Sequence, residues 1–383
     1  MRQKIAIIFA IGAFFIVLST SFVHADTFDS WDKNKDNVLS RDELPQRIRA
    51  NFDRADTNND GKITRKEDKA FRLKIAKKAK EKLAKSTDAI LLEKDIYYAG
   101  NKNPRQTLNL ILPKNKKGDK KLPLLVYIHG GGWQAGDKER GAGHLGRYVA
   151  SGEYAAASIN YRLTNEARWP SQLDDCKAAI RWLKKNAAKY GYDPEKIGVL
   201  GHSAGGHLVA MLGVTCGQKE GNVGVPAGKG ENGLAINGDV TCVVDYFGPT
   251  HFIAEDAKEP SKEVVAAQAT KKLQGPVEKL LGGPAAVMVK AAKDASPLYY
   301  VTQDSQPVLI FQGTEDRLVK LYQSVNFYEK YKKLGAQAWL TRVVGAGHGC
   351  RHKDIEKREK QFLDLHLRGI PSKISEEPIN VKK

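Results

Sequence analysis

The chain has 383 residues, and 41% of them are hydrophobic, which is enough to bury a large core. It carries 62 lysines and arginines against 44 acidic residues, a formal net charge of +18 at pH 7. That charge either attracts a polyanionic polymer or surface or serves solubility. No nucleic-acid-binding motif accompanies it, so we expect no nucleic-acid partner.

Residues 1–25 have the pattern of a secretory signal peptide. Arg2 and Lys4 precede an uncharged, largely apolar run from Ile5 to Leu18, and Val23-His24-Ala25 offers a cleavage site with small residues. The run is short for a membrane-spanning helix, which needs about 20 apolar residues. We therefore predict an exported protein, periplasmic or secreted, without a membrane span once the signal is removed. A retained anchor is the alternative.

Two stretches, residues 32–43 and 56–67, have the spacing of EF-hand calcium loops. In such a loop three side-chain oxygens, one carbonyl and a closing glutamate surround the ion. The predicted ligands are Asp32, Asn34, Asp36, Val38 and Glu43 in the first loop and Asp56, Asn58, Asp60, Lys62 and Glu67 in the second. We expect a tandem EF-hand segment over residues 26–70, in which Ca2+ is structural.

Two details refine this expectation. Asn37 stands where glycine is usual in the first loop, and asparagine tolerates the positive φ needed there. Leu39 and Ile63 occupy the same position in the two loops and are suited to pair as a short β-ladder. Residues 71–88, rich in lysine, are predicted to form a basic helical linker.

Beyond the linker, apolar strands alternate with amphipathic helices. The predicted strands include residues 124–128, 197–200, 307–311 and 338–344, and residues 171–189 and 319–334 show helical spacing. Such alternation predicts an α/β fold, with a mainly parallel sheet covered by helices on both faces.

The first strand runs directly into His129-Gly130-Gly131-Gly132-Trp133. Three consecutive glycines allow the backbone to approach a ligand closely and to turn its N–H groups inward. Such donors stabilise the oxyanion that forms during acyl transfer. We predict that the amides of Gly131 and Gly132, with that of Ala204, form an oxyanion hole.

The most informative segment is Gly201-His202-Ser203-Ala204-Gly205, between a predicted strand and a helix start. In a strand–turn–helix of this type a serine lies on a sharp turn with its hydroxyl exposed. We therefore predict that Ser203 is a nucleophile.

Two polar residues follow the last two strands. Asp316 lies after residues 307–311, and His348 lies after residues 338–344 in a glycine-rich loop. The chain order serine, aspartate, histidine is that of the α/β-hydrolases. We predict that His348 accepts the serine proton and that Asp316 orients the imidazole. Glu315 is the rival acid.

Together these motifs give residues 105–370 a clear resemblance. They resemble an α/β-hydrolase esterase of the hormone-sensitive-lipase-like type, and most closely the bacterial carbohydrate acetyl esterases and feruloyl esterases. The resemblance also rests on the segments 158–163, 172–183 and 245–250. Cys350 departs from the pattern, because an aromatic residue often follows the His-Gly pair.

The resemblance implies a catalytic domain over residues 89–371. The polar composition of the remaining residues, 372–383, predicts a mobile tail. The resemblance further implies a serine carboxylesterase that cleaves short-chain esters through an acyl-enzyme, with acetyl or feruloyl esters on polysaccharide as expected substrates. Catalysis would need no cofactor. Candidate walls of the acyl pocket are Trp133, Trp169, Phe252, Tyr299 and Tyr300.

The four cysteines, Cys176, Cys216, Cys242 and Cys350, could form disulfides in an exported protein. Cys216 and Cys242 flank a glycine-rich insertion, residues 217–239, and we predict that they pair.

Two other classes of function remain open from the sequence. A serine peptidase of the prolyl-oligopeptidase type shares the fold and the triad order, but it usually has an aromatic residue at the position of Ala204 and a large propeller domain. A calcium-dependent binding protein with an inert hydrolase domain is the other alternative, and the intact triad argues against it.

Overall fold

The computed structural model describes residues 26–44, 46–118, 120–216, 228–229, 235–236, 239–252 and 271–381. The chain divides into two units, Met1–Asp88 and Ala89–Lys383. The predicted signal peptide lies outside the described residues, as does most of the insertion 217–239. Within the described ranges, no helix combines the length and the apolar character that crossing a bilayer requires.

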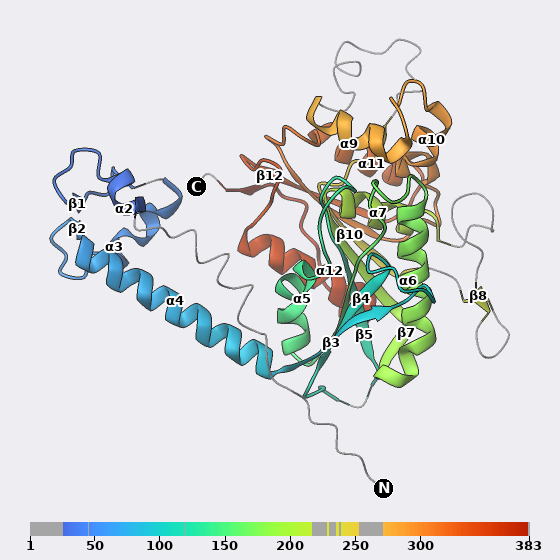
Figure 1. Cartoon of the computed structure of the whole chain (residues 1–383), viewed down its shortest axis with the longest axis horizontal. Coiled ribbons are helices and arrows are strands. Elements are labelled where there is room, and N and C mark those ends of the chain that lie inside the picture. Colours follow the sequence, from blue (N-terminus) through green and yellow to red (C-terminus); the bar gives the residue numbers. More distant parts are fainter. Residues whose placement is uncertain are drawn as a thin grey trace, which may run out of the picture. The chain divides into compact units, whose positions relative to one another are not determined.

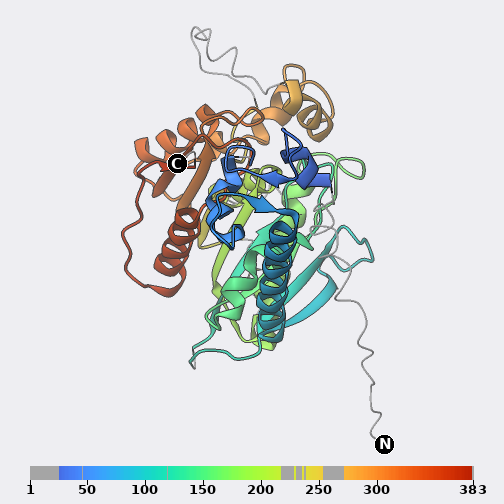
Figure 2. The ribbon, with the colours of Figure 1, turned by 90° about the vertical axis from the view of Figure 1, so that its left-hand side faces the viewer.

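The first unit contains two short helix–loop modules and one long helix (Figures 1 and 2). Its elements are α2 (Asp26–Trp31), β1 (Val38–Leu39), the 3-10 helix η1 (Gln46–Asn51), α3 (Phe52–Ala55), β2 (Ile63–Thr64) and α4 (Arg65–Asp88). β1 and β2 pair antiparallel with Leu39 opposite Ile63, which confirms the predicted ladder. Both side chains are buried in a small core with Phe28 and Phe52. Residues 71–88, the predicted linker, are the greater part of α4.

The second unit is built on a nine-stranded sheet in the order β13-β12-β11-β10-β7-β5-β6-β4-β3 (Figure 1). Its strands are β3 (Ile90–Tyr97), β4 (Thr107–Pro113), β5 (Leu122–Ile128), β6 (Ala155–Ile159), β7 (Tyr192–His202), β10 (Cys242–Tyr246), β11 (Val308–Gly313), β12 (Ala338–Val344) and β13 (Ile379–Asn380). From β13 to β6 every neighbouring pair is parallel, whereas β4 and β3 run antiparallel at the other edge. A separate hairpin pairs β8 (Gly228–Lys229) with β9 (Ala235–Ile236).

Helices cover both faces of this sheet. They are α5 (Arg140–Ala150), α6 (Ser171–Tyr190), α7 (Ala204–Val214), α9 (Lys271–Leu281), α10 (Val289–Asp294), the 3-10 helix η2 (Pro297–Tyr300), α11 (Leu321–Lys333) and α12 (Lys353–Arg368). Alternate strand residues point to opposite faces, so Leu124 and Val126 join a core with α6, α7 and α11, whereas Leu125 and Tyr127 join a core with α5 and α12. The predicted α/β class, with a mainly parallel sheet covered on both faces, is confirmed.

The C-terminal segment differs from the expected polar, mobile tail. Ile379 in β13 pairs with Val343 of β12 and extends the sheet. Ile374 and Ile379 are buried in the α12-side core, and the carbonyl of Glu377 accepts a hydrogen bond from Arg358 at 2.6 Å. The expectation was wrong because two isolated isoleucines in a polar stretch are enough to cover a sheet edge.

The predicted Cys216–Cys242 disulfide is also wrong, because all four cysteines are free thiols. Cys242 lies within β10 and points into the core beneath α12. Cys216 follows α7 and packs against the core on the opposite face of the sheet. Proximity to one insertion in the sequence therefore did not bring the two sulfur atoms to one side of the sheet.

Candidate active site

Ser203 occupies a strained turn between β7 and α7. Its φ of 55° and ψ of −119° are unfavourable for a residue with a side chain. The flanking glycines allow this turn, since a Cβ at Gly201 would lie 2.2 Å from the carbonyl oxygen of Gly205. A Cβ at Gly205 would lie 2.1 Å from the carbonyl oxygen of Ile128 in β5. The Gly-x-Ser-x-Gly pattern is thus a packing requirement of the turn that presents the serine.

The structure brings Ser203, His348 and Asp316 into one hydrogen-bonded row. The Ser203 Oγ lies 2.9 Å from Nε2 of His348, and Nδ1 of that ring lies 2.8 Å from Oδ2 of Asp316. The three residues come from the loops that follow β7, β12 and β11. Glu315, the rival acid, has an exposed side chain, whereas the Asp316 carboxylate is buried. The geometry therefore assigns the acid position to Asp316.

Three further groups hold the Asp316 carboxylate. Its Oδ1 accepts hydrogen bonds from the amides of Leu318 and Val319 at 2.8 and 3.0 Å, and its Oδ2 accepts one from the Gln312 side chain at 3.1 Å. Burial raises the pKa of Asp316, but the hydrogen bond and charge of His348, with the two amides, outweigh it and hold the pKa below its usual value. The ionised carboxylate accepts a hydrogen bond from Nδ1–H, a tautomer that would leave Nε2 free to accept the serine proton.

The predicted oxyanion loop lines the same cleft as Ser203. Gly131 and Gly132 have φ values of 127° and 60°, and a Cβ at Gly131 would lie 2.1 Å from the carbonyl oxygen of Ala135. Among the described residues, none accepts a hydrogen bond from the N–H of Gly131 or Gly132. Ala204 is the first residue of α7, where backbone amides lack a partner within the helix. These three amides line the same cleft as Ser203 and are available to an anionic oxygen.

Two histidines fix the ends of this loop. The ring of His129 stacks on Tyr161 at 4.3 Å, and the Tyr161 hydroxyl donates to the His129 carbonyl at 2.9 Å. At the other end the indole N–H of Trp133 donates to Nδ1 of His207 at 3.3 Å, and Nε2 of His207 lies 2.6 Å from the Ala295 carbonyl. Burial lowers the pKa of both histidines to about 4, so they are neutral structural groups at pH 7.

The triad and the loop line a cleft of about 1110 Å³. Its apolar wall includes Trp133, Phe247, Leu273, Pro276 and Leu318, and the ring of Phe247 packs edge-on against His348 at 4.7 Å. Of the five aromatic residues predicted as walls, only Trp133 lines the cleft. Trp169 and Phe252 pack around His207 instead.

A buried carboxylate that the sequence did not predict lies between α12, α5 and β10. Glu359 of α12 is fully buried and accepts hydrogen bonds from Tyr148 at 2.5 Å and Arg147 at 2.8 Å, both on α5, and from Tyr246 of β10. The Tyr246 ring stacks on His202, the residue before Ser203, at 4.3 Å. In the sequence, the one hint of this cluster was segment 245–250, which contains Tyr246. The family resemblance included this segment but gave it no role.

We expect Glu359→Gln to cost about 1–3 kcal/mol of unfolding free energy, because a neutral amide would replace a fully buried carboxylate and set its NH₂ group against the donors Tyr148 and Tyr246. Glu356→Gln is the matched control, since it removes an exposed carboxylate from the same Arg147 and should cost about 0–1 kcal/mol. Urea unfolding of both variants measures the difference. Equal losses would contradict the structural role of Glu359.

The contribution of Glu359 to stability depends on pH. Burial raises the pKa of Glu359, but His144, Arg147 and the Tyr148 hydroxyl outweigh it and lower the pKa from 4.5 to about 2. A depressed pKa stabilises the fold above the unfolded value and loses that contribution as pH falls. The gap between wild type and Glu359→Gln should therefore shrink between pH 4.5 and 2.

The two loops predicted to bind calcium have their carboxylates turned onto backbone amides. In the first loop the Asp32 carboxylate accepts from the amides of Asp36 at 3.1 Å and Asn37 at 2.9 Å, and Asn37 has the positive φ expected of it, 63°. Glu43 accepts from the amides of Ser40 at 2.8 Å and Lys33 at 3.1 Å.

The second loop repeats the arrangement. Asp56 accepts from Asp60 and Gly61, and Glu67 accepts from Thr57 and Thr64. Asn34 and Asn58 each donate to the aspartate two residues on, Asp36 or Asp60, while Val38 begins β1 and Lys62 directly precedes β2. In the part of the chain that the structure describes, no group of three or more His, Cys, Asp and Glu side chains is arranged to hold a metal.

Each of the two units matches a known protein family. A family model described as BD-FAE matches residues 108–331, more than half of the chain, and one described as EF hand matches residues 25–46 and 48–67. Among solved structures, a truncated form of a carbohydrate esterase from gut microbiota is 32% identical with a TM-score of 0.63, over 73% of this chain and 96% of that one. A bifunctional GH43-CE protein of Bacteroides eggerthii is 28% identical with a TM-score of 0.60, over 72% and 38%.

Curated relatives are also esterases by name. The chain is 30% identical to Esterase LipC of Mycobacterium tuberculosis, over 64% of this chain and 57% of that protein. It is 28% identical to a probable isoprenylcysteine alpha-carbonyl methylesterase, ICMEL1, of Oryza sativa subsp. japonica, over 73% of this chain and 60% of the relative. The chain thus spans less than two thirds of the length of these relatives.

Proposed function

The chain belongs to the BD-FAE family of esterase domains, and from this membership we propose that it is a serine carboxylesterase. The observation that carries the proposal is the row from Ser203 Oγ through His348 to Asp316, set beside amides without an acceptor. Those groups are what acyl transfer to a serine requires.

In the proposed reaction, Ser203 Oγ attacks the ester carbonyl while Nε2 of His348 accepts its proton. The oxyanion accepts hydrogen bonds from the amides of Gly131, Gly132 and Ala204. The alcohol leaves with the proton from His348, and an acyl-enzyme remains on Ser203. Water then attacks this ester with His348 as the base, and the acid is released.

We propose short-chain esters on a carbohydrate as substrates and export as the location. The support for a carbohydrate is the 32% identity to a carbohydrate esterase from gut microbiota, over nearly the whole of that chain. The support for export is the signal-like pattern of residues 1–25. Acetyl and feruloyl groups are the two acyl candidates.

Activity on p-nitrophenyl esters should be highest for acetate to butyrate and should fall beyond about four to six carbons. The reason is that Arg140, Arg147 and Arg351 line the same cleft as the apolar side chains, so a long acyl chain would meet charged groups there. A series of acyl chain lengths at equal concentration measures this, and a maximum at ten or more carbons would contradict it. Acetylated xylan against methyl ferulate then separates the two acyl candidates.

We further propose that the EF-hand unit binds Ca2+ in a structural role. Support comes from the family match, the oxygen-rich donor set of each loop and the positive φ at the sixth positions, Asn37 and Gly61. Hydrogen bonds from Thr64 lower the pKa of Glu67 to about 2, so this carboxylate is ionised at neutral pH. Its turn from backbone amides onto the ion would close the loop.

Calcium at a hundredfold excess over its Kd should stabilise the first unit by about 2.7 kcal/mol. EDTA should therefore lower the melting temperature of this unit while hydrolysis of p-nitrophenyl acetate stays nearly constant. Glu43→Gln with Glu67→Gln should abolish the calcium-dependent shift. Loss of small-ester activity on EDTA treatment, restored by calcium, would show instead that the ion supports the active site.

A further inference from the structure

We propose that the catalytic cleft continues into a cationic channel between α5 and α12 that binds the anionic groups of an acidic glycan. Carboxylate and sulfate groups share the required chemistry. The inference rests on the proposed esterase function and names its substrate class, an ester carried by an acidic rather than a neutral polysaccharide.

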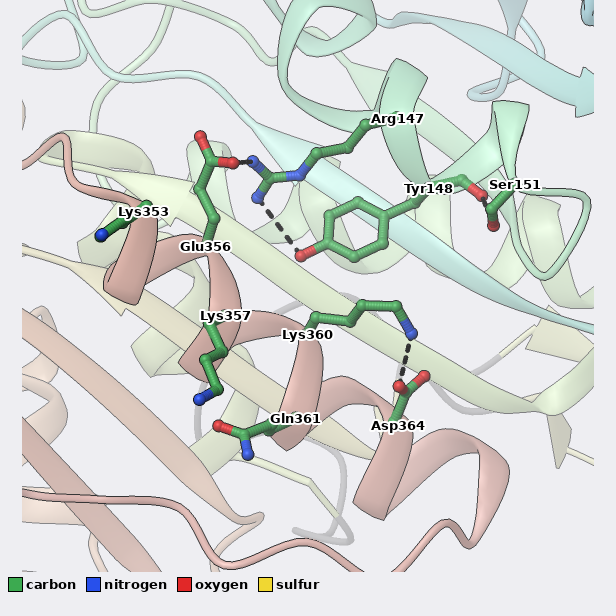
Figure 3. A pocket seen from close by; sticks show the side chains of 9 residues that line it. All are labelled: Arg147, Tyr148, Ser151, Lys353, Glu356, Lys357, Lys360, Gln361 and Asp364. Carbon is green, nitrogen blue, oxygen red and sulfur yellow. Dashed lines mark hydrogen bonds and ion pairs between the residues drawn. The ribbon is translucent and has the colours of Figure 1, made fainter.

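The channel consists of two adjoining hollows. The cleft that contains Ser203 and His348 extends along α5 to Arg147 and along the start of α12 to Glu356. A second hollow, of about 430 Å³, is lined by the same two residues and continues along both helices (Figure 3). A chain of sugars bound with its ester at Ser203 can therefore extend from one hollow into the other.

Cationic side chains outnumber the carboxylates along this path. Arg140 and Arg351 line the first hollow, and Lys353, Lys357 and Lys360 line the second. Arg147 pairs with Glu356, and Lys360 pairs with Asp364, as the dashed contacts in Figure 3 show. Within the described ranges, no carboxylate pairs with Arg140, Arg351, Lys353 or Lys357, and all four side chains are exposed.

The shape of the site favours a glycan over a membrane surface. Figure 3 shows Glu356 and Lys360 on the α5 side of α12, whereas Lys353, Lys357 and Gln361 extend from the other side of that helix. All of them line the same hollow as Arg147, Tyr148 and Ser151, so the cations lie along a hollow that includes residues of both helices. Of the large apolar side chains that are exposed in the described residues, none lines either hollow, so nothing there could insert into a bilayer.

The chemistry of the cations fits a repeated anion. A guanidinium binds carboxylate or sulfate oxygens through two parallel N–H groups, and an ammonium binds them as a point charge. Exposed charges of this kind are screened by salt. The affinity for an acidic chain should therefore fall with ionic strength, whereas reaction with a small neutral ester should not.

The test compares three acetylated polymers: polygalacturonate, a sulfated dextran and neutral xylan. For the full-length protein, kcat/KM should be at least about tenfold higher on one of the acidic polymers and should fall between 20 and 300 mM salt, values chosen to span the Debye lengths from about 20 to 6 Å. The acidic polymer with the higher kcat/KM shows whether the channel prefers carboxylate or sulfate groups. Lys353→Gln with Lys357→Gln should raise KM for that polymer about tenfold more than for p-nitrophenyl acetate.

Lys332→Gln with Lys333→Gln is the matched control, because it removes the same charge from exposed positions on α11 outside both hollows. A preference for acetylated xylan, or equal effects of the two double variants, would overturn the proposal. Failure of the esterase function itself would appear separately, as absent p-nitrophenyl acetate hydrolysis. Calorimetric binding of trigalacturonate and of a sulfated trisaccharide to Ser203→Ala then tests the channel without catalysis. Weaker binding when Lys353→Gln and Lys357→Gln are added, but not when Lys332→Gln and Lys333→Gln are added, would support the proposal.

Discussion

Replacing Ser203 by alanine is expected to lower kcat for p-nitrophenyl acetate by about 10⁴- to 10⁶-fold, the size of loss seen when a triad serine is removed. The Oγ atom is the group that His348 holds at 2.9 Å, and no other hydroxyl lies within its described hydrogen bonds. The fold should be retained, because alanine keeps the Cβ and removes only the hydroxyl.

Ser375→Ala is the control for this change. It removes a hydroxyl from the C-terminal segment, outside the cleft, and should leave kcat within about twofold. A fluorophosphonate probe should add its mass to wild type and to Ser375→Ala but not to Ser203→Ala. More than a tenth of wild-type activity in Ser203→Ala would refute the proposed mechanism.

The strained turn explains why the sequence indicated this site so directly. A serine at φ 55° needs close backbone packing on both sides, and only glycine at positions 201 and 205 avoids contacts of 2.1–2.2 Å. The same reasoning applies to Gly131, which lies against Ala135. These requirements are local, so they leave a local pattern that can be recognised without a structure.

The sheet was predictable for a related reason. β5 and the first four residues of β11 are continuous apolar runs because both faces of a parallel sheet are covered. β12 is mainly apolar and is interrupted by Thr341 and Arg342. Each of the three strands ends where a polar loop begins. Because the carboxyl ends of parallel strands meet at one edge, Ser203, Asp316 and His348 had to come close if the three strands lay in one sheet.

The parts that could not be predicted depend on contacts between distant residues. Glu359 meets His144 and Tyr246 across 215 and 113 positions of sequence, and no spacing rule connects them. Likewise, whether Cys216 and Cys242 can pair depends on which face of β10 Cys242 occupies, and the sequence near the insertion does not reveal this.

Glu315 and Asp316 are neighbours, and the sequence offered both as the acid partner of His348. A pair of isosteric changes tests which of them has this role. Asp316→Asn is expected to lower kcat by about 10⁴-fold. The asparagine oxygen can keep its hydrogen bonds from the amides of Leu318 and Val319, so its NH₂ group would turn toward His348. The imidazole would then carry its proton on Nε2 and could not accept the one from Ser203.

Glu315→Gln makes the same chemical change at an exposed side chain one residue away, and kcat should stay within about twofold. KM should change little in either variant, since Asp316 acts through His348 and does not touch the substrate. Because the triad works as a unit, Ser203→Ala combined with Asp316→Asn should be no slower than Ser203→Ala alone. If Glu315→Gln were the slower single variant, or if the losses simply multiplied, Asp316 would not be the residue that orients the base.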